Sequence, residues 1–356
     1  MIASPSPDMA GFAGRIARWQ KQSGRRGLPW QDTKDPYRIW LSEIMLQQTQ
    51  VVTVMTYYAR FLARFPTIHA LAQAEQDEVM PYWAGLGYYA RARNLHRCAR
   101  VVCEQWQGRF PTSADEIAQL PGIGRSTAAA IAAFAYGERS PIMDGNVKRV
   151  FTRYFGISGD PARRETEKKL WDAAEEVLAR AKDDLDMTAY TQGLMDLGSS
   201  HCARKADCRA CPLHDDCHAR LTSRQAELPT PRKRKQQDQR RCAMLVLESE
   251  AGILLEQRPS EGIWGGLWSL PQFDDGPALR QACRQRGLSV AEDRRMAGLQ
   301  HVFSHFKLDI EPWHVICAVD AVSEPAPNQA WMPVSALPEA ALPAPVRKIL
   351  DGLFPA

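Results

Sequence analysis

The hydrophobic periodicity of this chain changes near Cys242, and that change restricts the possible folds more than any other feature. Up to about residue 220, apolar residues recur at helical spacing and no convincing alternating strand interrupts them. Beyond Cys242, apolar and charged residues alternate, most clearly over residues 306–310, with the period of a half-buried strand. The length of 356 residues also exceeds the usual size of one domain. We therefore expect an all-α domain followed by a smaller α+β domain.

A polar and basic segment, residues 222–241, separates these two parts. It contains two prolines and, from Arg232 to Arg241, six basic residues against one aspartate. This composition is typical of a solvated linker, or of a connector that lies along phosphates if the first domain binds DNA. The expected domains are thus residues 1–221 and 242–356, joined by this linker.

Local patterns predict the individual helices and strands. One long helix or two abutting helices should run from Asp35 to Phe65, with Asp35 as the N-cap and Pro36 at the first helical position. Further helices are expected at 67–80, 88–106, 113–119, 125–136, 144–155, 162–181 and 186–199. In the second part we expect strands over 242–248, 252–258, 267–273 and 305–315, and helices over 276–287 and 344–354.

Bulk composition excludes some locations but decides little about function. Hydrophobic residues make up 45% and charged residues 24% of the chain, as in ordinary globular proteins. The net charge of +4 is too small to identify a nucleic-acid-binding protein without local evidence. The first residues lack the basic and apolar regions of a signal peptide, and no uncharged apolar run is long enough to span a membrane. We expect a location in the cytoplasm or at the nucleoid.

The nine cysteines fall into two groups. Four lie within 16 residues with Cys-x5-Cys-x2-Cys-x5-Cys spacing, namely Cys202, Cys208, Cys211 and Cys217. Four thiolates in so short a loop can hold zinc or an iron–sulfur cluster, and spacing alone does not choose between them. The scattered members are expected as ordinary buried thiols, because the cytosol does not favour disulfides; they are Cys98, Cys103, Cys242, Cys283 and Cys317.

The segment Leu120-Pro-Gly-Ile-Gly124 predicts a tight turn that opens directly onto a helix of small residues. Glycines let the backbone approach a phosphate closely, and the helix N-terminus presents unpaired N–H groups with a partial positive charge. A plain turn between helices would look the same. About twenty residues later, Asp144 stands at a predicted helix start, where an aspartate is also a common N-cap. Taken together, the turn and the carboxylate favour a site that faces a distorted nucleic-acid backbone.

These motifs resemble the helix-hairpin-helix DNA glycosylase superfamily over residues 15–220. Within that superfamily the match is to MutY-type adenine DNA glycosylases, through LPWQDTKDPYRIWLSEIMLQQTQV at 28–51, GLGYYARARNL at 85–95 and DGNVKRV at 144–150. The resemblance implies an enzyme of base excision repair that flips adenine out of double-stranded DNA when the base is mispaired with 8-oxoguanine or guanine. We expect it to act as a monomer.

The resemblance implies two catalytic carboxyl groups. Glu43 would donate a proton to adenine N7, and its apolar helix neighbours would raise its pKa by desolvation. Asp144 would stabilise the oxocarbenium-like sugar or add to it transiently before water attacks. Neither residue would point to catalysis by itself, because an exposed helical glutamate and an N-cap aspartate are both common.

Ser126 stands where endonuclease III-like lyases carry a nucleophilic lysine. A serine cannot form a Schiff base with the sugar, so we expect base removal without strand cleavage. Two alternatives stay open at this point. One is an endonuclease III-like glycosylase and lyase for oxidised pyrimidines, and the other is a mismatch-binding protein without catalysis.

Recognition residues follow from the same resemblance. The DNA-contacting positions are Gln48, Thr49, Tyr88, Gly122, Gly124, Ser126, Asn146 and Lys148. The residues matched to the adenine pocket are Arg26, Leu28, Trp30 and Gln192. In the second domain, the loop matched to 8-oxoguanine recognition is Phe303, Ser304 and His305.

The resemblance also implies a 4Fe-4S cluster on the four clustered cysteines, although the family usually has six residues, rather than five, between the first two. The second domain resembles the Nudix-like lesion-recognition domain of the same family. No glutamate occurs between Gly262 and Val290, and the expected helix carries Arg280, Arg284 and Arg286 where a Nudix hydrolase needs magnesium-binding glutamates. We therefore expect binding rather than pyrophosphate hydrolysis.

Overall fold

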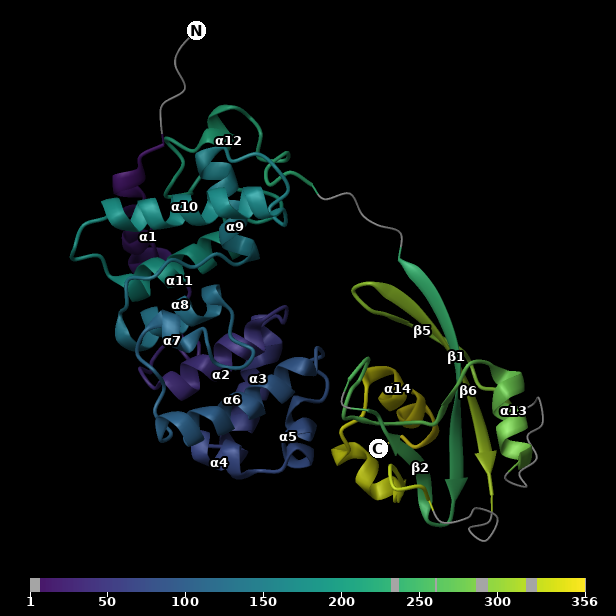
Figure 1. Cartoon of the computed structure of the whole chain (residues 1–356). Helices are drawn as coiled ribbons and strands as arrows, with labels where there is room; N and C mark the ends of the chain where they lie inside the picture. Colours follow the sequence, from purple (N-terminus) through teal and green to yellow (C-terminus); the bar gives the residue numbers. More distant parts are fainter. Residues whose placement is uncertain (1–6, 232–236, 260, 286–293, 318–324, 356) are drawn as a thin grey trace. The chain divides into compact units, whose positions relative to one another are not determined.

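The computed structural model of the chain describes residues 7–231, 237–259, 261–285, 294–317 and 325–355. It divides into two compact units, one formed by Met1–Gln73 with Asn94–Lys233 and the other by Ala74–Arg93 with Arg234–Ala356 (Figure 1). Helices make up the first unit, whereas the part of the chain after the basic segment contains a mixed sheet with helices. The predicted order, all-α followed by α+β, is confirmed.

The helical part contains these elements: α1 (Met9–Ser23), α2 (Pro36–Leu46), α3 (Val51–Arg64), α4 (Ile68–Gln73), α5 (Gln76–Trp83), α6 (Ala90–Trp106), α7 (Ala114–Ile117), α8 (Arg125–Tyr136), α9 (Gly145–Phe155), α10 (Arg164–Arg180), α11 (Met187–Ser199) and α12 (His218–Leu221). The region from Asp35 to Phe65 forms two helices, which was one of the two predicted alternatives. The single helix expected at 67–80 is wrong, because Glu75 caps a new helix there. The sequence patterns did not predict α1.

Local hydrogen bonds explain where α2 begins and where it stops. The Asp35 carboxylate accepts the N–H of Tyr37 at 2.9 Å, and Pro36 starts the helix, as predicted. Gln48 has a φ of 58°, which no helix can include, and it separates α2 from α3. The break therefore sits inside the polar segment that follows α2.

Small residues let α8 occupy the middle of the helical unit. Its side chains from Ala128 to Ala133 are buried, and the helix packs against α2, α7 and α11. Close packing of this kind needs residues without bulky side chains. Helix α1 also packs against α11, and the Phe12 ring of α1 meets the rings of Phe151 and Tyr154 on α9 with centroids 5.3 and 4.7 Å apart.

The second part is built on a mixed sheet. Its elements are β1 (Asp238–Ser249), β2 (Gly252–Gln257), β3 (Trp268–Ser269), β4 (Gln272–Phe273), α13 (Gly276–Gln285), β5 (Leu299–Val302), β6 (Phe306–Ile316), β7 (Gln329–Met332), the 3-10 helix η3 (Val334–Glu339) and α14 (Ala344–Leu353). Within the described residues the strand order is β3-β2-β1-β6-β5, with β4 paired to β1 and β7 to β2. The long central strands β1 and β6 are parallel, in register from Asp238 with Phe306 to Glu248 with Ile316.

Two details of the sheet differ from prediction. The strand expected at 267–273 is interrupted at Leu270 and Pro271, because proline has no N–H to donate to a ladder. The short strands β5 and β7 were not predicted. Arg286 of the expected basic helix lies outside the described residues, as do residues 232–236 of the expected linker.

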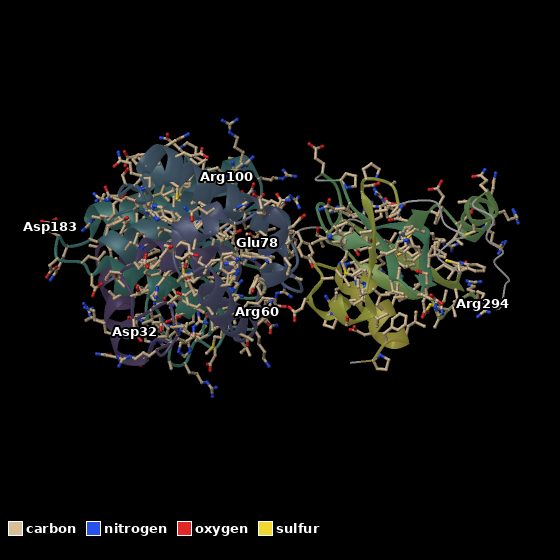
Figure 2. All side chains as sticks on the ribbon, turned by 90° about the horizontal axis from the view of Figure 1, so that it is seen from below. Asp32, Arg60, Glu78, Arg100, Asp183 and Arg294 are labelled. Carbon is tan, nitrogen blue, oxygen red and sulfur yellow. The ribbon has the colours of Figure 1, made fainter. Side chains whose placement is uncertain are left out.

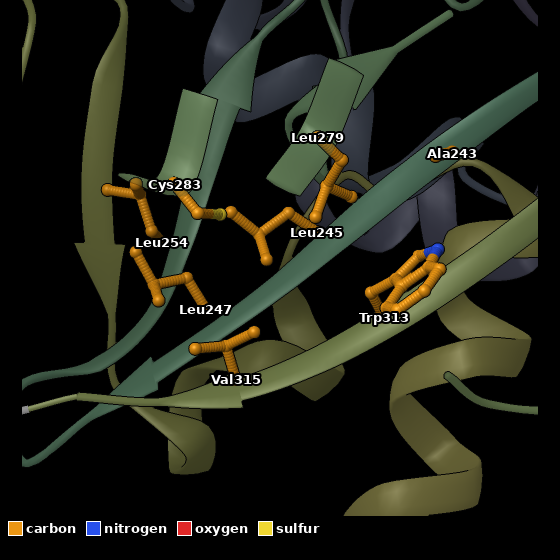
Figure 3. Close-up of a cluster of buried hydrophobic side chains, with 8 residues drawn as sticks. All are labelled: Ala243, Leu245, Leu247, Leu254, Leu279, Cys283, Trp313 and Val315. Atoms are coloured by element: carbon orange, nitrogen blue, oxygen red, sulfur yellow. The ribbon is translucent and has the colours of Figure 1, made fainter. Parts of the chain in front are cut away.

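Alternation along the central strands produces the core of this part. Ala243, Leu245 and Leu247 share one face of β1, and Trp313 and Val315 continue that face on β6 (Figure 3). Leu279 and Cys283, four residues apart on α13, cover it. All of these side chains are at most 4% exposed.

Charged side chains such as Arg100 and Asp183 extend outward from the helical unit (Figure 2). None of the helices within the described ranges has the length and apolar composition that a membrane crossing requires.

Candidate active site

The turn before α8 has the backbone that its glycines predict. Gly122 has a φ of +78°, a left-handed conformation, and an added Cβ there would lie 2.6 Å from Cβ of Asn94. Gly124 is the N-cap of α8, and no side chain among the described residues caps the first N–H groups of that helix. These N–H groups and the positive end of the helix dipole suit an anion such as a phosphate.

Gly122→Ala is expected to lower the free energy of unfolding by at least about 1–2 kcal/mol, the usual cost of a left-handed conformation for a residue with a side chain. Gly124→Ala is the matched control, because Gly124 has a φ of −89° and a Cβ there would meet nothing within 4 Å. Thermal or urea unfolding of both variants checks this. Equal stability of the two would contradict the backbone assigned to the turn.

Asp144 occupies the start of α9 and is held there by two bonds. Its carboxylate accepts the N–H of Val147 at 2.7 Å, and its backbone carbonyl accepts the N–H of Lys148 at 2.8 Å. A negative charge is favoured at a helix N-terminus. Ser126, in the first turn of α8, accepts the N–H of Met143 at 2.8 Å. The serine hydroxyl therefore fixes the chain directly before Asp144 against α8.

Glu43 on α2 is half-buried, and the pKa of its carboxyl group is raised. Burial, together with the nearby charge of Asp144, raises its pKa from 4.5 to about 8. The two carboxyl groups are thus close enough to influence each other, although they come from helices about a hundred residues apart. Near neutral pH, Glu43 holds a proton that it can donate.

A cavity of about 220 Å³ opens beside Glu43 within the helical unit. Three of the four residues predicted for an adenine pocket line it, namely Arg26, Trp30 and Gln192. Leu28 is not among its lining residues; its N–H is bonded to the Gln31 side chain at 3.2 Å. Sequence reasoning did not point to Lys34, whose ammonium at the cavity donates to the carbonyl of Phe134 at 2.7 Å.

Two of the residues predicted to contact DNA have strained backbones. Gln48 and Tyr88 have φ values of 58° and 51°, and Tyr88 is 50% exposed. A positive φ in residues other than glycine is uncommon and concentrates at functional sites. Thr49 follows Gln48 in the same break between α2 and α3, and Tyr88 lies in the second unit, between α5 and α6.

Asn146 and Lys148, also predicted to contact DNA, have partners within the protein. The Asn146 side chain accepts a hydrogen bond from Arg149 at 2.7 Å, and Lys148 forms an ion pair with Glu167 at 2.6 Å. Lys148 would have to leave Glu167 to bind a phosphate with its full charge.

The four clustered cysteines are free thiols in the segment from the end of α11 to the start of α12. Burial, together with the neighbouring clustered cysteines, raises the pKa of Cys211 to about 12. Among the described residues, no three cysteine, histidine, aspartate or glutamate side chains converge in an arrangement that could hold a metal ion. Four thiolates suit a metal as ligands. In this structure, however, their sulfur atoms would have to turn toward a common centre to bind one.

Two arginines of α9 support the segment that begins with Cys202. Arg153 is only 4% exposed, and its guanidinium donates to Sγ of Cys202 at 3.5 Å and to the carbonyl of Ala203 at 2.7 Å. Arg149 donates to the carbonyl of Cys202 at 2.7 Å. A buried guanidinium needs negative or polar partners, and here the cysteine segment supplies them.

Phe303, Ser304 and His305 form the turn between the antiparallel strands β5 and β6, so the strand expected from residue 305 begins one residue later, at Phe306. The Phe303 ring stacks on Phe306 with centroids 4.5 Å apart and meets His301 edge-on at 4.6 Å. The hydroxyl of Ser304 and Nδ1 of His305, both exposed, lie 2.9 Å apart. The turn thus combines an anchored aromatic ring with exposed polar groups.

Family models match both parts of the chain. A model described as HhH-GPD superfamily base excision DNA repair protein matches residues 41–176, and a NUDIX domain model matches residues 242–352. A solved structure of a thermostable thymine-DNA glycosylase is similar with a TM-score of 0.53 and 30% identity, over 59% of this chain and 95% of that one.

Curated relatives extend this similarity to nearly the whole chain. The adenine DNA glycosylase of Buchnera aphidicola subsp. Acyrthosiphon pisum is 34% identical over 345 residues, which cover 96% of this chain and 97% of the relative. Adenine DNA glycosylase of Homo sapiens is 31% identical over 407 residues, covering 96% of this chain and 74% of its own length.

The fold and the site define a helix-hairpin-helix DNA-repair glycosylase with a second, NUDIX-type domain. At the next level, the chain belongs to the adenine DNA glycosylase family. The predicted family, fold class and kind of enzyme are thereby confirmed.

Proposed function

We propose that this protein removes adenine mispaired with 8-oxoguanine or guanine from double-stranded DNA, using Glu43 as general acid and Asp144 to stabilise the sugar cation. The observation that carries the proposal is the raised pKa of Glu43, about 8, beside the cavity and within the influence of Asp144. Two carboxyl groups with different surroundings suit an acid and a charge-stabilising group.

The reaction breaks one bond and forms one. Glu43 gives its proton to N7 of the flipped adenine, and the electrons of the glycosidic bond pass to the base as that bond breaks. The sugar is left with positive charge at C1′, which the Asp144 carboxylate opposes. Water then adds to C1′, its proton passes to a carboxylate, and an abasic site and free adenine result.

The same proposal excludes strand cleavage by an amine. A lyase needs an amine that forms a Schiff base with the sugar. At the position where such lyases carry a lysine, α8 has Ser126, whose hydroxyl accepts the Met143 N–H. We infer that the enzyme is monofunctional. This separates it from endonuclease III-like lyases.

DNA recognition is proposed to involve both units. The uncapped N-terminus of α8 and the Gly122–Gly124 turn grip the phosphate backbone beside the flipped nucleotide. Gln48, Thr49 and Tyr88 fill the gap that adenine leaves, because an aromatic ring can offset part of the lost stacking. Phe303, Ser304 and His305 read the 8-oxoguanine.

The four thiolates of Cys202, Cys208, Cys211 and Cys217 are proposed to hold a 4Fe-4S cluster. Its chemistry here is structural, since it fixes the basic segment that carries Arg204 and Lys205 near the DNA backbone. Cys211→Ser should remove the visible charge-transfer absorption and most of the bound iron of purified protein and lower its thermal midpoint, whereas Cys98→Ser, at a buried thiol outside the cluster, should keep the iron. Zinc in place of iron in the wild type would contradict the assigned cluster.

Single-turnover excision tests the proposed substrate. Duplexes that carry adenine opposite 8-oxoguanine, guanine or thymine are incubated with excess enzyme, and abasic sites are revealed with alkali. We expect excision opposite 8-oxoguanine and guanine and little opposite thymine. Tight binding to all mispairs without any base release would instead identify a non-catalytic mismatch-binding protein.

A further inference from the structure

Asp196 is a buried carboxylate behind the cavity, and the mechanism above does not use it. It is 2% exposed and lies on α11, one helical turn after Gln192. Three N–H groups converge on it: Gln192 Nε2 donates to Oδ1 at 2.9 Å, Arg25 Nε donates to Oδ1 at 2.7 Å, and the backbone N–H of Arg25 donates to Oδ2 at 3.0 Å. The ion pair with Arg25 offsets the cost of a buried charge.

This arrangement decides which way the Gln192 amide points. A charged carboxylate only accepts hydrogen bonds, so Gln192 must turn its NH2 group toward Asp196. The carbonyl oxygen, Oε1, is then the end of the amide left for the cavity that Gln192 lines. Within the described part of the chain, no hydrogen bond to that oxygen is found.

The helix that carries both residues is held firmly. α11 packs so closely on α1 that a Cβ on Gly193 would lie 2.7 Å from Cγ2 of Ile16. Asp186 caps the helix by accepting the N–H of Ala189 at 2.9 Å. The oriented amide therefore stands on a rigid element, which is what selective recognition requires.

We propose that Asp196 is a positioning residue that fixes Gln192 as a hydrogen-bond acceptor, so that the cavity selects purines with an amino group at position 6 over purines with a carbonyl there. Adenine presents a donor at this position, and hypoxanthine presents an acceptor. Both keep the N7 that Glu43 protonates, so the two bases differ in this contact rather than in the acid step. The inference rests on the proposed excision of adenine.

Asp196→Asn is expected to reverse the orientation of the Gln192 amide. The backbone N–H of Arg25 cannot move, whereas the Arg25 side chain is 41% exposed and can turn to solvent. The new amide therefore keeps its oxygen on the backbone N–H and turns its NH2 group toward Gln192. Gln192 responds by accepting with Oε1, which leaves its NH2 group facing the cavity.

The test is the ratio of single-turnover rate constants for adenine and hypoxanthine, each placed opposite 8-oxoguanine in the same duplex. We expect Asp196→Asn to lower this ratio about tenfold or more, with hypoxanthine excision less affected than adenine excision. Thr191→Val is the matched control on α11. Thr191 is buried, its hydroxyl has no hydrogen-bond partner among the described residues, and its replacement leaves the bond between Asp196 and Gln192 intact.

A second variant keeps the test decisive if Asp196→Asn does not fold. Gln192→Met leaves the ion pair of Asp196 with Arg25 in place and removes the oriented amide, so it should lower the same ratio. A folded Asp196→Asn protein, or failing that a Gln192→Met protein, with the wild-type ratio would overturn the inference alone. Wild-type enzyme that releases no adenine would overturn the proposed function as well.

Discussion

Glu43→Gln is expected to reduce the single-turnover rate of adenine excision by roughly 10²–10⁴-fold, the contribution usual for a positioned general acid. Glutamine has nearly the same shape, so the cavity and the fold should persist, but it has no proton to give to N7. Duplex binding should remain. Rapid-quench excision and a duplex binding titration measure the two effects separately.

A matched control for this variant is Glu104→Gln on α6. Glu104 is 64% exposed and pairs only weakly with Arg100 at 3.9 Å, so its replacement should leave the rate within about twofold. Undiminished turnover by Glu43→Gln would contradict the proposed role of Glu43 as general acid.

Glu43 also gives a readout that needs no DNA. Its pKa in the folded protein, about 8, lies above its ordinary value of 4.5, so the folded state binds more protons between these values. The corresponding stability is fully present below about pH 4.5 and is lost as the pH rises through 8. Thermal unfolding at several pH values should therefore show a smaller loss of stability between about pH 4.5 and 8 in Glu43→Gln than in the wild type.

Asp144→Asn is expected to lower excision by about 10²–10³-fold or more, because a neutral amide cannot oppose the charge that develops at C1′. The variant should stay folded, since asparagine is as good an N-cap as aspartate and can still accept the Val147 N–H. Asp144→Ala should in addition lose about 1 kcal/mol of stability with the cap. Comparing excision rates and unfolding midpoints of the two separates catalysis from capping.

Asp275→Asn supplies the control for this substitution. Asp275 accepts the N–H of Ala278 at 2.8 Å at the start of α13, so the change removes the same charge from the same kind of helix end. We expect excision by this variant to match the wild type. A normal rate in Asp144→Asn would leave the helix cap as the only role of Asp144.

Signals in the sequence predicted those parts of the site that depend on local chemistry. The glycines predicted a tight turn, and Gly122 has the positive φ that such a turn needs. The preference of aspartate for N-cap positions predicted Asp144 at a helix start, where the structure has it. The grouping of the four cysteines was visible in their spacing. The apolar neighbours of Glu43 predicted its raised pKa.

Other parts depend on tertiary contacts that the sequence does not reveal. The i, i+4 spacing of Gln192 and Asp196 fits a surface as well as a cavity wall, and only the fold brings Arg25 to them. The break between α4 and α5 carries neither glycine nor proline and ends at a glutamate cap. β5 and β7 have four residues each, too few for alternation to identify a strand.

The most direct test of the whole account is the product of one turnover on a labelled duplex with adenine opposite 8-oxoguanine. Enzyme in excess is incubated near neutral pH, and each sample is split and analysed with and without alkali. The account predicts that free adenine appears in step with alkali-sensitive abasic sites, while the untreated strand stays intact. Strand breaks without alkali, or no adenine at all from a duplex that is bound, would contradict it.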